Sequence, residues 1–207
     1  MVQSHTRTSA PNTPRPTVIE ILLDETGSMM MCRDDLIKGF NTFINQQKQM
    51  GGECYVTLTK FHSNRTRTPY VDLDVNMVPA LTRENFIPDD CTNLYDRIYS
   101  RINARKTLLE SWSSEPIVIF VVMTDGADNA SLLSIKDAAK SISDHPNWNF
   151  QFFGAHSGAI EVGRKLGIEH ITEFEKTKFA QAFETLSATT TAYRVGQNVA
   201  PRQNIMV

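Results

Sequence analysis

The feature that most constrains the fold is an unbroken apolar run, Ile117–Met123, which ends at Thr124-Asp125-Gly126. A second run, Thr17–Leu23, ends at Asp24 in the same way. Continuous apolar runs of this length are typical of strands that are covered on both faces, and such strands occur in parallel sheets between helices. Glu20 interrupts the second run, and the sequence offers no reason for it beyond a position near the outer end of the strand.

Four further segments predict strands. Cys54–Phe61 and Trp148–Gly154 are rich in β-forming residues, and Ile168–Phe174 predicts a short last strand. Val71–Asn76 alternates apolar and polar residues, which is typical of a half-exposed strand and favours an antiparallel edge. The segment before it, His62–Pro69, is short enough to be the loop of a hairpin.

The segments between these strands predict helices. Apolar residues recur in them at helical intervals and form four stripes, which we expect to face the core. The alternation predicts a Rossmann-like three-layer αβα sandwich with a mostly parallel sheet and right-handed crossovers. Ligands bind such sheets at the carboxyl ends of the strands. Functional residues are therefore expected just after Leu23, Phe61, Met123 and Gly154. The stripes are Ile37, Phe40 and Ile44; Leu94, Ile98 and Ile102; Leu132, Ile135, Ala139 and Ile142; and Phe179, Phe183 and Leu186.

Composition excludes several classes of protein. The 207 residues include 21 Lys and Arg against 23 Asp and Glu, a formal net charge of −2, which argues against a nucleic-acid-binding or membrane-surface protein. No apolar run approaches the roughly 18 residues of a membrane span, and the first residues lack the apolar segment of a signal peptide. Three widely spaced cysteines favour reduced thiols, so we expect a cytoplasmic protein. We predict one domain at 17–195, between a flexible tail at 1–16 and a second tail at 196–207.

Oxygen-bearing side chains follow the predicted strands. Asp24–Met29 offers a carboxylate and two hydroxyls at alternate positions, Thr124–Gly126 offers a second carboxylate, and Asp89–Asn93 offers a further hydroxyl before a helix. Each fragment alone is a common cap or turn, but their joint appearance at strand and helix boundaries is more specific. Hard oxygen ligands without His or Cys suit Mg²⁺ or Mn²⁺. The sequence therefore predicts a divalent-cation site at the carboxyl edge of the sheet.

These motifs resemble the metal-ion-dependent adhesion site (MIDAS) of von Willebrand factor A (vWA) domains, and the resemblance covers the body of the chain from Thr17 to Arg194. It implies a six-stranded sheet of order 3-2-1-4-5-6 with the third strand antiparallel. It also implies a set of metal ligands. Thr26, Ser28 and Thr92 would contact the metal, while Asp24 and Asp125 would act directly or through water.

Two positions depart from the pattern of the family. Thr26 stands where Ser is most frequent, which keeps the hydroxyl. The loop before Thr92 carries Asp90-Cys91 where a Gly-rich approach is common, so the geometry of that loop is less constrained by the resemblance.

The resemblance implies a binding module and not an enzyme. In the family the protein leaves one coordination position of the metal open, and a carboxylate of a partner protein often completes it, which makes a strong directional contact. No nucleophile with an oriented base is visible beside the predicted metal. Six acidic residues are expected on loops at this edge, where they would repel one another without a cation. They are Asp24, Glu25, Asp89, Asp90, Asp125 and Asp128.

Two other interpretations remain. Asp24–Ser28 also resembles the phosphorylation loop of haloacid-dehalogenase phosphotransferases, in which Asp24 would be the nucleophile with Mg²⁺; the sequence after Met123 matches that family poorly. Alternatively, the domain is one subunit of a larger assembly, as vWA-like modules are beside AAA+ ATPases; no P-loop occurs in this chain. Rim residues that line a partner surface or pack inside are His62, His156, Cys91 and Met29–Met31.

Overall fold

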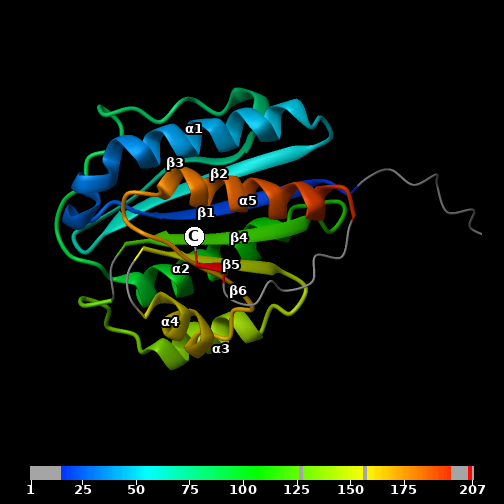
Figure 1. Ribbon diagram of the computed structural model, residues 1–207. Coiled ribbons are helices and arrows are strands. Elements are labelled where there is room, and N and C mark those ends of the chain that lie inside the picture. Colours follow the sequence, from blue (N-terminus) through cyan, green and yellow to red (C-terminus); the bar gives the residue numbers. More distant parts are fainter. Residues whose placement is uncertain (1–14, 126–127, 156–157, 197–204, 207) are drawn as a thin grey trace, which may run out of the picture.

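The computed structural model describes residues 15–125, 128–155, 158–196 and 205–206. In this part of the chain one sheet has the strand order β3-β2-β1-β4-β5-β6-β7 (Figure 1). The β2–β3 pair is antiparallel and the other pairs are parallel. The predicted six-stranded order with an antiparallel third strand is confirmed, and β7 is a short addition at the β6 edge. The strands are β1 (Thr17–Asp24), β2 (Cys54–His62), β3 (Arg65–Asp74), β4 (Ile117–Thr124), β5 (Asn149–Gly154), β6 (His170–Glu173) and β7 (Ile205–Met206).

Helices cover both faces of the sheet, as the three-layer prediction requires. Helices α1 and α5 lie on one face, and α2, α3 and α4 lie on the other (Figure 1). Two short 3₁₀ helices, η1 and η2, follow β1 and β3. The bounds are α1 (Arg33–Gln49), α2 (Leu94–Leu109), α3 (Ile135–Ser143), α4 (Ala159–Lys165), α5 (Phe179–Arg194), η1 (Gly27–Cys32) and η2 (Val75–Met77).

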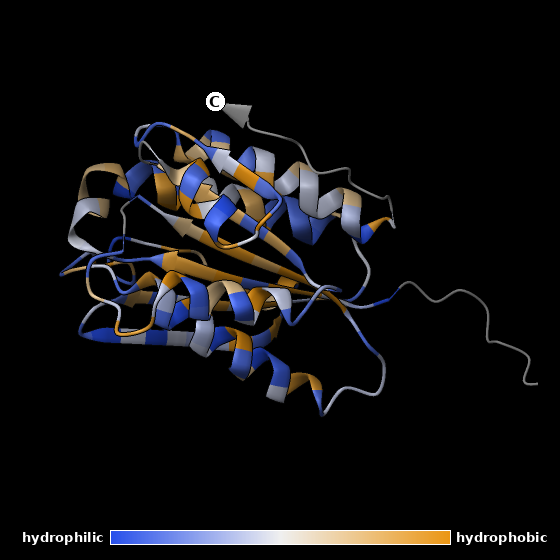
Figure 2. Ribbon diagram, turned by 90° about the horizontal axis from the view of Figure 1, so that it is seen from below, coloured by the Kyte–Doolittle hydropathy of each residue, from blue (hydrophilic) through white to orange (hydrophobic). Residues whose placement is uncertain are grey.

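The central strands are apolar on both sides because each face meets a helical layer. In β4, Val121 packs into the core under α1 and α5, whereas Phe120 and Val122 pack into the core under α2, α3 and α4. Figure 2 shows the same arrangement as hydrophobic strands between helices whose outer faces are hydrophilic. The unbroken apolar run Ile117–Met123 is thus explained by its central place in the sheet.

Glu20 is not near the end of its strand, as the sequence suggested, but in the middle of β1 and fully buried. Arg101 donates to Oε1 of Glu20 at 2.8 and 3.0 Å, and Nε of Arg105 donates to Oε2 at 2.9 Å. Arg105 is also fully buried and forms a second ion pair with Asp72 at 2.7 Å. A buried carboxylate is tolerated here because two guanidinium groups from α2 neutralise it.

The antiparallel edge strand begins earlier than predicted. β3 starts at Arg65, so the hairpin loop is only Ser63-Asn64 and not the whole of His62–Pro69. The expected alternation fails at Val71, which is 45% exposed, and is confirmed from Leu73 to Asn76. Its neighbour Asp72 has a φ of 45° and turns inward to Thr57 and Arg105. The contacts of Asp72 with Arg105 and Thr57 therefore override the period-two pattern at Val71 and Asp72.

The prediction that Leu132 belongs to the buried stripe of α3 is wrong. The helix begins at Ile135 behind a capping box made by Ser134 and Asp137, and Leu132 lies before it with 96% of its surface exposed. The buried side of α3 is formed instead by Ala138, Ser141 and Ile142.

The ends of the domain stay a prediction, since most of both tails lies outside the described residues. Of the N-terminal tail, Arg15 donates to the carbonyl oxygens of Glu115 and Pro116, and Pro16 accepts from the amide of Ile117. Of the C-terminal tail, β7 pairs with β6. Within the described ranges, none of the helices has the length and hydropathy needed to span a bilayer.

Candidate metal site

The first predicted ligand, Asp24, ends β1 and is fully buried. Its Oδ1 accepts a hydrogen bond from the amide of Thr26 at 2.8 Å, and its Oδ2 accepts one from Oγ1 of Thr124 at 2.6 Å. Burial raises the pKa of Asp24 to about 6, the charge of Asp125 adds to this, and the hydrogen bonds from Thr124 and Thr26 oppose it. A nearby cation would therefore stabilise the ionised form of the Asp24 carboxylate.

The next three predicted ligands touch one another. Oγ1 of Thr26 lies 3.2 Å from Oγ of Ser28, and Ser28 donates to Oδ1 of Asp125 at 2.6 Å. The contact arises because β1 and β4 are parallel neighbours, which brings the loops after Asp24 and Thr124 together at the carboxyl edge. Thr26 precedes η1 but its side chain makes no capping hydrogen bond there, so the ordinary helix-cap explanation does not account for this hydroxyl.

The fifth predicted ligand, Thr92, is buried on the adjoining loop and stands apart from this hydrogen-bonded set in the described part of the chain. The amide of Gly27 donates to the carbonyl of Asp90 at 3.1 Å, which holds the two loops side by side. Asp90 has a φ of 64°, the left-handed conformation that favours glycine, in the loop where the sequence resemblance implies a Gly-rich approach. The amide of Thr92 is fixed by Oδ1 of Asn129 at 2.9 Å.

The expected cluster of six acids is not a single negative site. Glu25 is buried beside two cations, with Nζ of Lys60 at 3.3 Å and a guanidinium nitrogen of Arg67 at 2.9 Å. Asp128 accepts from Oγ of Ser131 at 2.5 Å and caps the start of α2. No three Asp, Glu, His or Cys side chains converge as metal ligands within the described ranges. The carboxylates at the centre of the candidate site are therefore two, Asp24 and Asp125.

Lys176 is the site residue that the sequence did not reveal. It lies between β6 and α5, and its Nζ is 2.9 Å from Oδ2 of Asp125. The segment is held by the rings of Phe174 and Phe179, whose centroids are 4.7 Å apart, and by a hydrogen bond from the amide of Lys178 to the carbonyl of Glu175. No local pattern could have indicated it, because Lys176 meets Asp125 only through the order of the strands.

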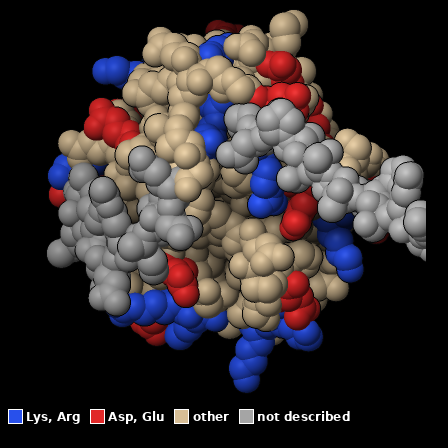
Figure 3. Space-filling model, turned by 90° about the vertical axis from the view of Figure 1, so that its right-hand side faces the viewer, with Lys and Arg blue, Asp and Glu red and all other residues tan. Residues whose placement is uncertain are grey.

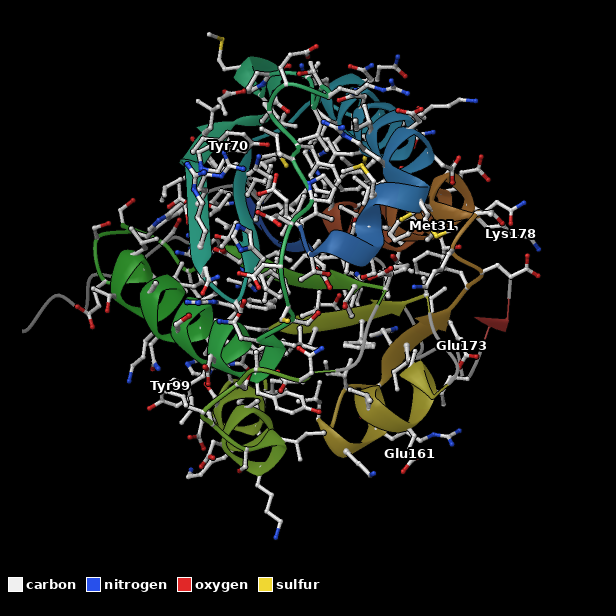
Figure 4. The ribbon with its side chains drawn as sticks, turned by 90° about the vertical axis from the view of Figure 1, so that its left-hand side faces the viewer. Met31, Tyr70, Tyr99, Glu161, Glu173 and Lys178 are labelled. Carbon is white, nitrogen blue, oxygen red and sulfur yellow. The ribbon has the colours of Figure 1, made fainter. Side chains whose placement is uncertain are left out.

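The rim is partly apolar. Figure 4 looks onto this edge and shows Met31 and Lys178 on the same side of it. Met31 is 90% exposed and Met30 is half exposed, whereas Met29 is buried. His62 is buried, and its Nδ1 lies 3.8 Å from Oδ2 of Asp90, which favours packing inside the protein over contact with a partner. Cys91 is exposed. Gly126 and His156 lie outside the described residues.

The opposite edge of the sheet, where the parallel strands begin, differs from the carboxyl edge in how its charged side chains are arranged. It faces the viewer in Figure 3, where Lys and Arg are interspersed with Asp and Glu. Arg15 and Glu115 belong to this edge and form an exposed pair at 3.9 Å. Buried carboxylates with neighbouring hydroxyls occur instead at the carboxyl edge, at Asp24 and Asp125.

The donor set at the carboxyl edge fits a hard divalent cation. The hydroxyls of Thr26 and Ser28 and the buried carboxylate of Asp125 form an all-oxygen group linked at 2.6 to 3.2 Å, and the buried carboxylate of Asp24 adjoins it through the amide of Thr26. The Asp125 carboxylate already attracts a cation, the Lys176 ammonium. The same geometry does not suit a nucleophilic Asp24, because both of its oxygens accept hydrogen bonds inside the protein and neither is exposed.

Comparisons with known proteins agree on the fold. No protein-family model matches the sequence, and no curated protein matches it. Solved structures do match. Proximal thread matrix protein 1 from the mussel byssus, with a zinc-occupied MIDAS motif, is 12% identical, with a TM-score of 0.57 over 88% of this chain and 47% of that one. Manganese-loaded TRAP from Plasmodium vivax is 15% identical, with a TM-score of 0.54 over 83% of this chain and 74% of that one.

A third similar structure is the pilus adhesin SpaC from Lactobacillus rhamnosus GG, in an open conformation. It is 12% identical, with a TM-score of 0.63 over 86% of this chain and 30% of that one. The chain thus spans about half the length of the mussel protein and less of the pilus adhesin. Together with the strand order, these matches show that the chain has a vWA-like α/β sandwich fold.

Proposed function

We propose that this chain is a protein-interaction module that binds its partner through a divalent cation, Mg²⁺ or Mn²⁺. The residues that would hold the cation are Asp24, Thr26, Ser28, Thr92 and Asp125. The observation that carries the proposal is the hydrogen-bonded set of Thr26, Ser28 and Asp125 at the carboxyl edge of a vWA-like sheet. Two of the similar structures support it by their metals, manganese in one and zinc at a MIDAS motif in the other.

The two carboxylates, Ser28 and the exposed methionines have different tasks in this proposal. Asp24 and Asp125 supply negative charge from buried positions, where a cation is attracted more strongly than it would be in water. Ser28 is exposed and therefore stands between the buried carboxylate of Asp125 and the solvent. When bound, the cation supplies an open coordination position that a partner carboxylate fills. Met30 and Met31 then offer the partner an adaptable apolar contact beside it.

The binding role is favoured over phosphoryl transfer. A covalent aspartate must present an oxygen to the phosphorus atom, and the oxygens of Asp24 are turned to Thr26 and Thr124 instead. Two of the similar structures are those of a thread matrix protein and a pilus adhesin, which also supports binding without catalysis. We further propose a cytoplasmic location, which the three free cysteines support. We also propose that the chain acts as one part of a larger assembly.

Calorimetric titration with Mg²⁺ and with Mn²⁺ tests the proposal. We expect the wild-type protein to bind, and we expect Asp125→Ala to lose binding because a central carboxylate is removed. Asp89→Ala is the matched control, since Asp89 is an exposed acid on the adjoining loop. Equal heats for wild type and Asp125→Ala would refute the site. A second test uses a partner protein bound to this chain: if the partner stays bound when EDTA removes the metal, recognition does not use the metal.

A further inference from the structure

The Asp125 carboxylate is already neutralised by this chain. Ser28 donates to its Oδ1 at 2.6 Å, and Lys176 donates to its Oδ2 at 2.9 Å, so both oxygens are engaged. The side chain of Asp125 is fully buried. An isolated buried carboxylate is costly, and the ammonium group of Lys176 lowers that cost.

The two partners of this ion pair differ in how firmly they are held. Asp125 follows the central strand β4, whereas Lys176 reaches the site from a connecting segment and its side chain is 43% exposed. Lys60, which neutralises Glu25 nearby, has only 5% of its side chain exposed. An exposed lysine side chain retains several rotamers and a strongly hydrated head group, so Lys176 can move into solvent once another cation neutralises Asp125.

The Lys176 ammonium and a divalent cation at the same Asp125 carboxylate repel each other, so each weakens the binding of the other. We propose that Lys176 is the resident counter-ion of the metal site: it neutralises Asp125 in the metal-free protein and leaves when the divalent cation binds. Metal binding is then an exchange of one cation for another, and Lys176 is a residue that sets the metal affinity. This inference rests on the proposed function, because it assumes that Asp125 is a ligand.

Removing the lysine charge tests the exchange. Mn²⁺ is titrated calorimetrically into the wild-type protein, Lys176→Met and the control Lys178→Met. Lys178 is two residues away, is partly exposed and pairs with Glu175 at 3.5 Å, so its substitution makes the same change in net charge without touching Asp125. We expect Lys176→Met to bind Mn²⁺ about tenfold more tightly than the wild type, and Lys178→Met to bind as the wild type does.

The outcomes separate this inference from the proposed function. If wild type and Lys176→Met bind Mn²⁺ equally, the counter-ion role is wrong and the metal site stands. If only Lys176→Met binds, the counter-ion role is supported and the wild-type protein is not a metal-dependent module. If neither binds, both are wrong, because removing the competing lysine would have exposed the site.

A second measurement needs no metal. The urea midpoint of unfolding in EDTA is compared for wild type, Lys176→Met, Asp125→Asn and the double variant, and circular dichroism establishes that each is folded. We expect Lys176→Met to lower the midpoint in the wild-type background and to leave it unchanged in the Asp125→Asn background. An equal decrease in both backgrounds would show that Lys176 acts elsewhere than on Asp125.

Discussion

Two of the buried carboxylates at the adjacent strands β1 and β4 are neutralised in different ways. Glu20, in the middle of β1, is held by Arg101 and Arg105, whose side chains are 12% and 0% exposed. Asp125, at the end of β4, is held by Lys176, whose side chain is 43% exposed. Both carboxylates are themselves fully buried.

The difference separates a structural ion pair from a candidate functional one. The counter-ions of Glu20 come from a helix packed on the sheet and are guanidinium groups, which hold one oxygen each: Arg101 donates twice to Oε1 and Arg105 donates to Oε2. The counter-ion of Asp125 comes from a connecting segment and stands at the solvent boundary. Burial of the cation, rather than burial of the carboxylate, therefore indicates which site can exchange its partner.

The largest expected effect is at the structural pair. Arg105→Met leaves Glu20 with one cation and Asp72 with none in its place, so we expect the free energy of unfolding to fall by about 3–5 kcal/mol in a urea titration. Arg101→Met is the control and should cost less, because Arg101 is partly exposed. A smaller loss for Arg105→Met than for Arg101→Met would contradict the structural assignment.

Asp24 gives the next effect, through pH. Its pKa is raised to about 6 in the folded protein from an ordinary value of 3.8, so between these values the folded state binds more protons than the unfolded state. Stability from this group is therefore largest below pH 4 and is lost as pH rises to 6, by up to about 3 kcal/mol. The measurement is the difference in unfolding free energy between wild type and Asp24→Asn across this range in EDTA. A difference that stays constant with pH would be inconsistent with a raised pKa.

Glu25 sharpens the comparison, because it lies at the edge of the candidate site yet is neutralised like Glu20. Lys60→Met removes a buried cation while Arg67 remains, so we expect a loss of about 2 kcal/mol in unfolding free energy. We also expect unchanged Mn²⁺ affinity in the folded variant, since neither Lys60 nor Glu25 touches Asp24 or Asp125 in the contacts described above. A change in Mn²⁺ affinity as large as that expected for Lys176→Met would show that removing any positive charge at this edge alters metal binding.

The smallest effect is expected at Leu132. Its side chain is 96% exposed, and the segment is held by its backbone, since Asp96 accepts from the amides of Leu132 and Leu133. Leu132→Ser should therefore change the free energy of unfolding by less than about 0.5 kcal/mol. Asp96→Ala, which removes those hydrogen bonds, is the comparison and should cost more. A large loss for Leu132→Ser alone would place that side chain in a packed environment.

Much of the fold could be predicted from local patterns. The run Ile117–Met123 has to be covered on both faces, and that requirement alone led to a parallel sheet between helices. The motif Asp24–Met29 and the pair Thr124-Asp125 were expected to meet because both follow strands, and the contact between Ser28 and Asp125 confirms that they do. Their role as metal ligands stays a prediction.

Other features were beyond local patterns because they depend on residues distant in the chain. The sequence does not explain the buried Glu20, because its partners Arg101 and Arg105 lie on α2, 81 and 85 residues later in the chain. The sequence also places Leu132 in a helix, although α3 begins three residues later. Glu25 was grouped with the metal-site acids, although Lys60 and Arg67 from the β2–β3 hairpin neutralise it.

The sequence by itself determined the layered fold and the oxygen-rich loops, because periodicity and strand-end residues are local properties. Only the tertiary structure decided which charges pair, because an ion pair requires two groups within about 4 Å and strand order sets those distances. That is why Asp24 and Asp125 were visible in the sequence as acids of interest, whereas Lys176, 51 residues from Asp125, was not.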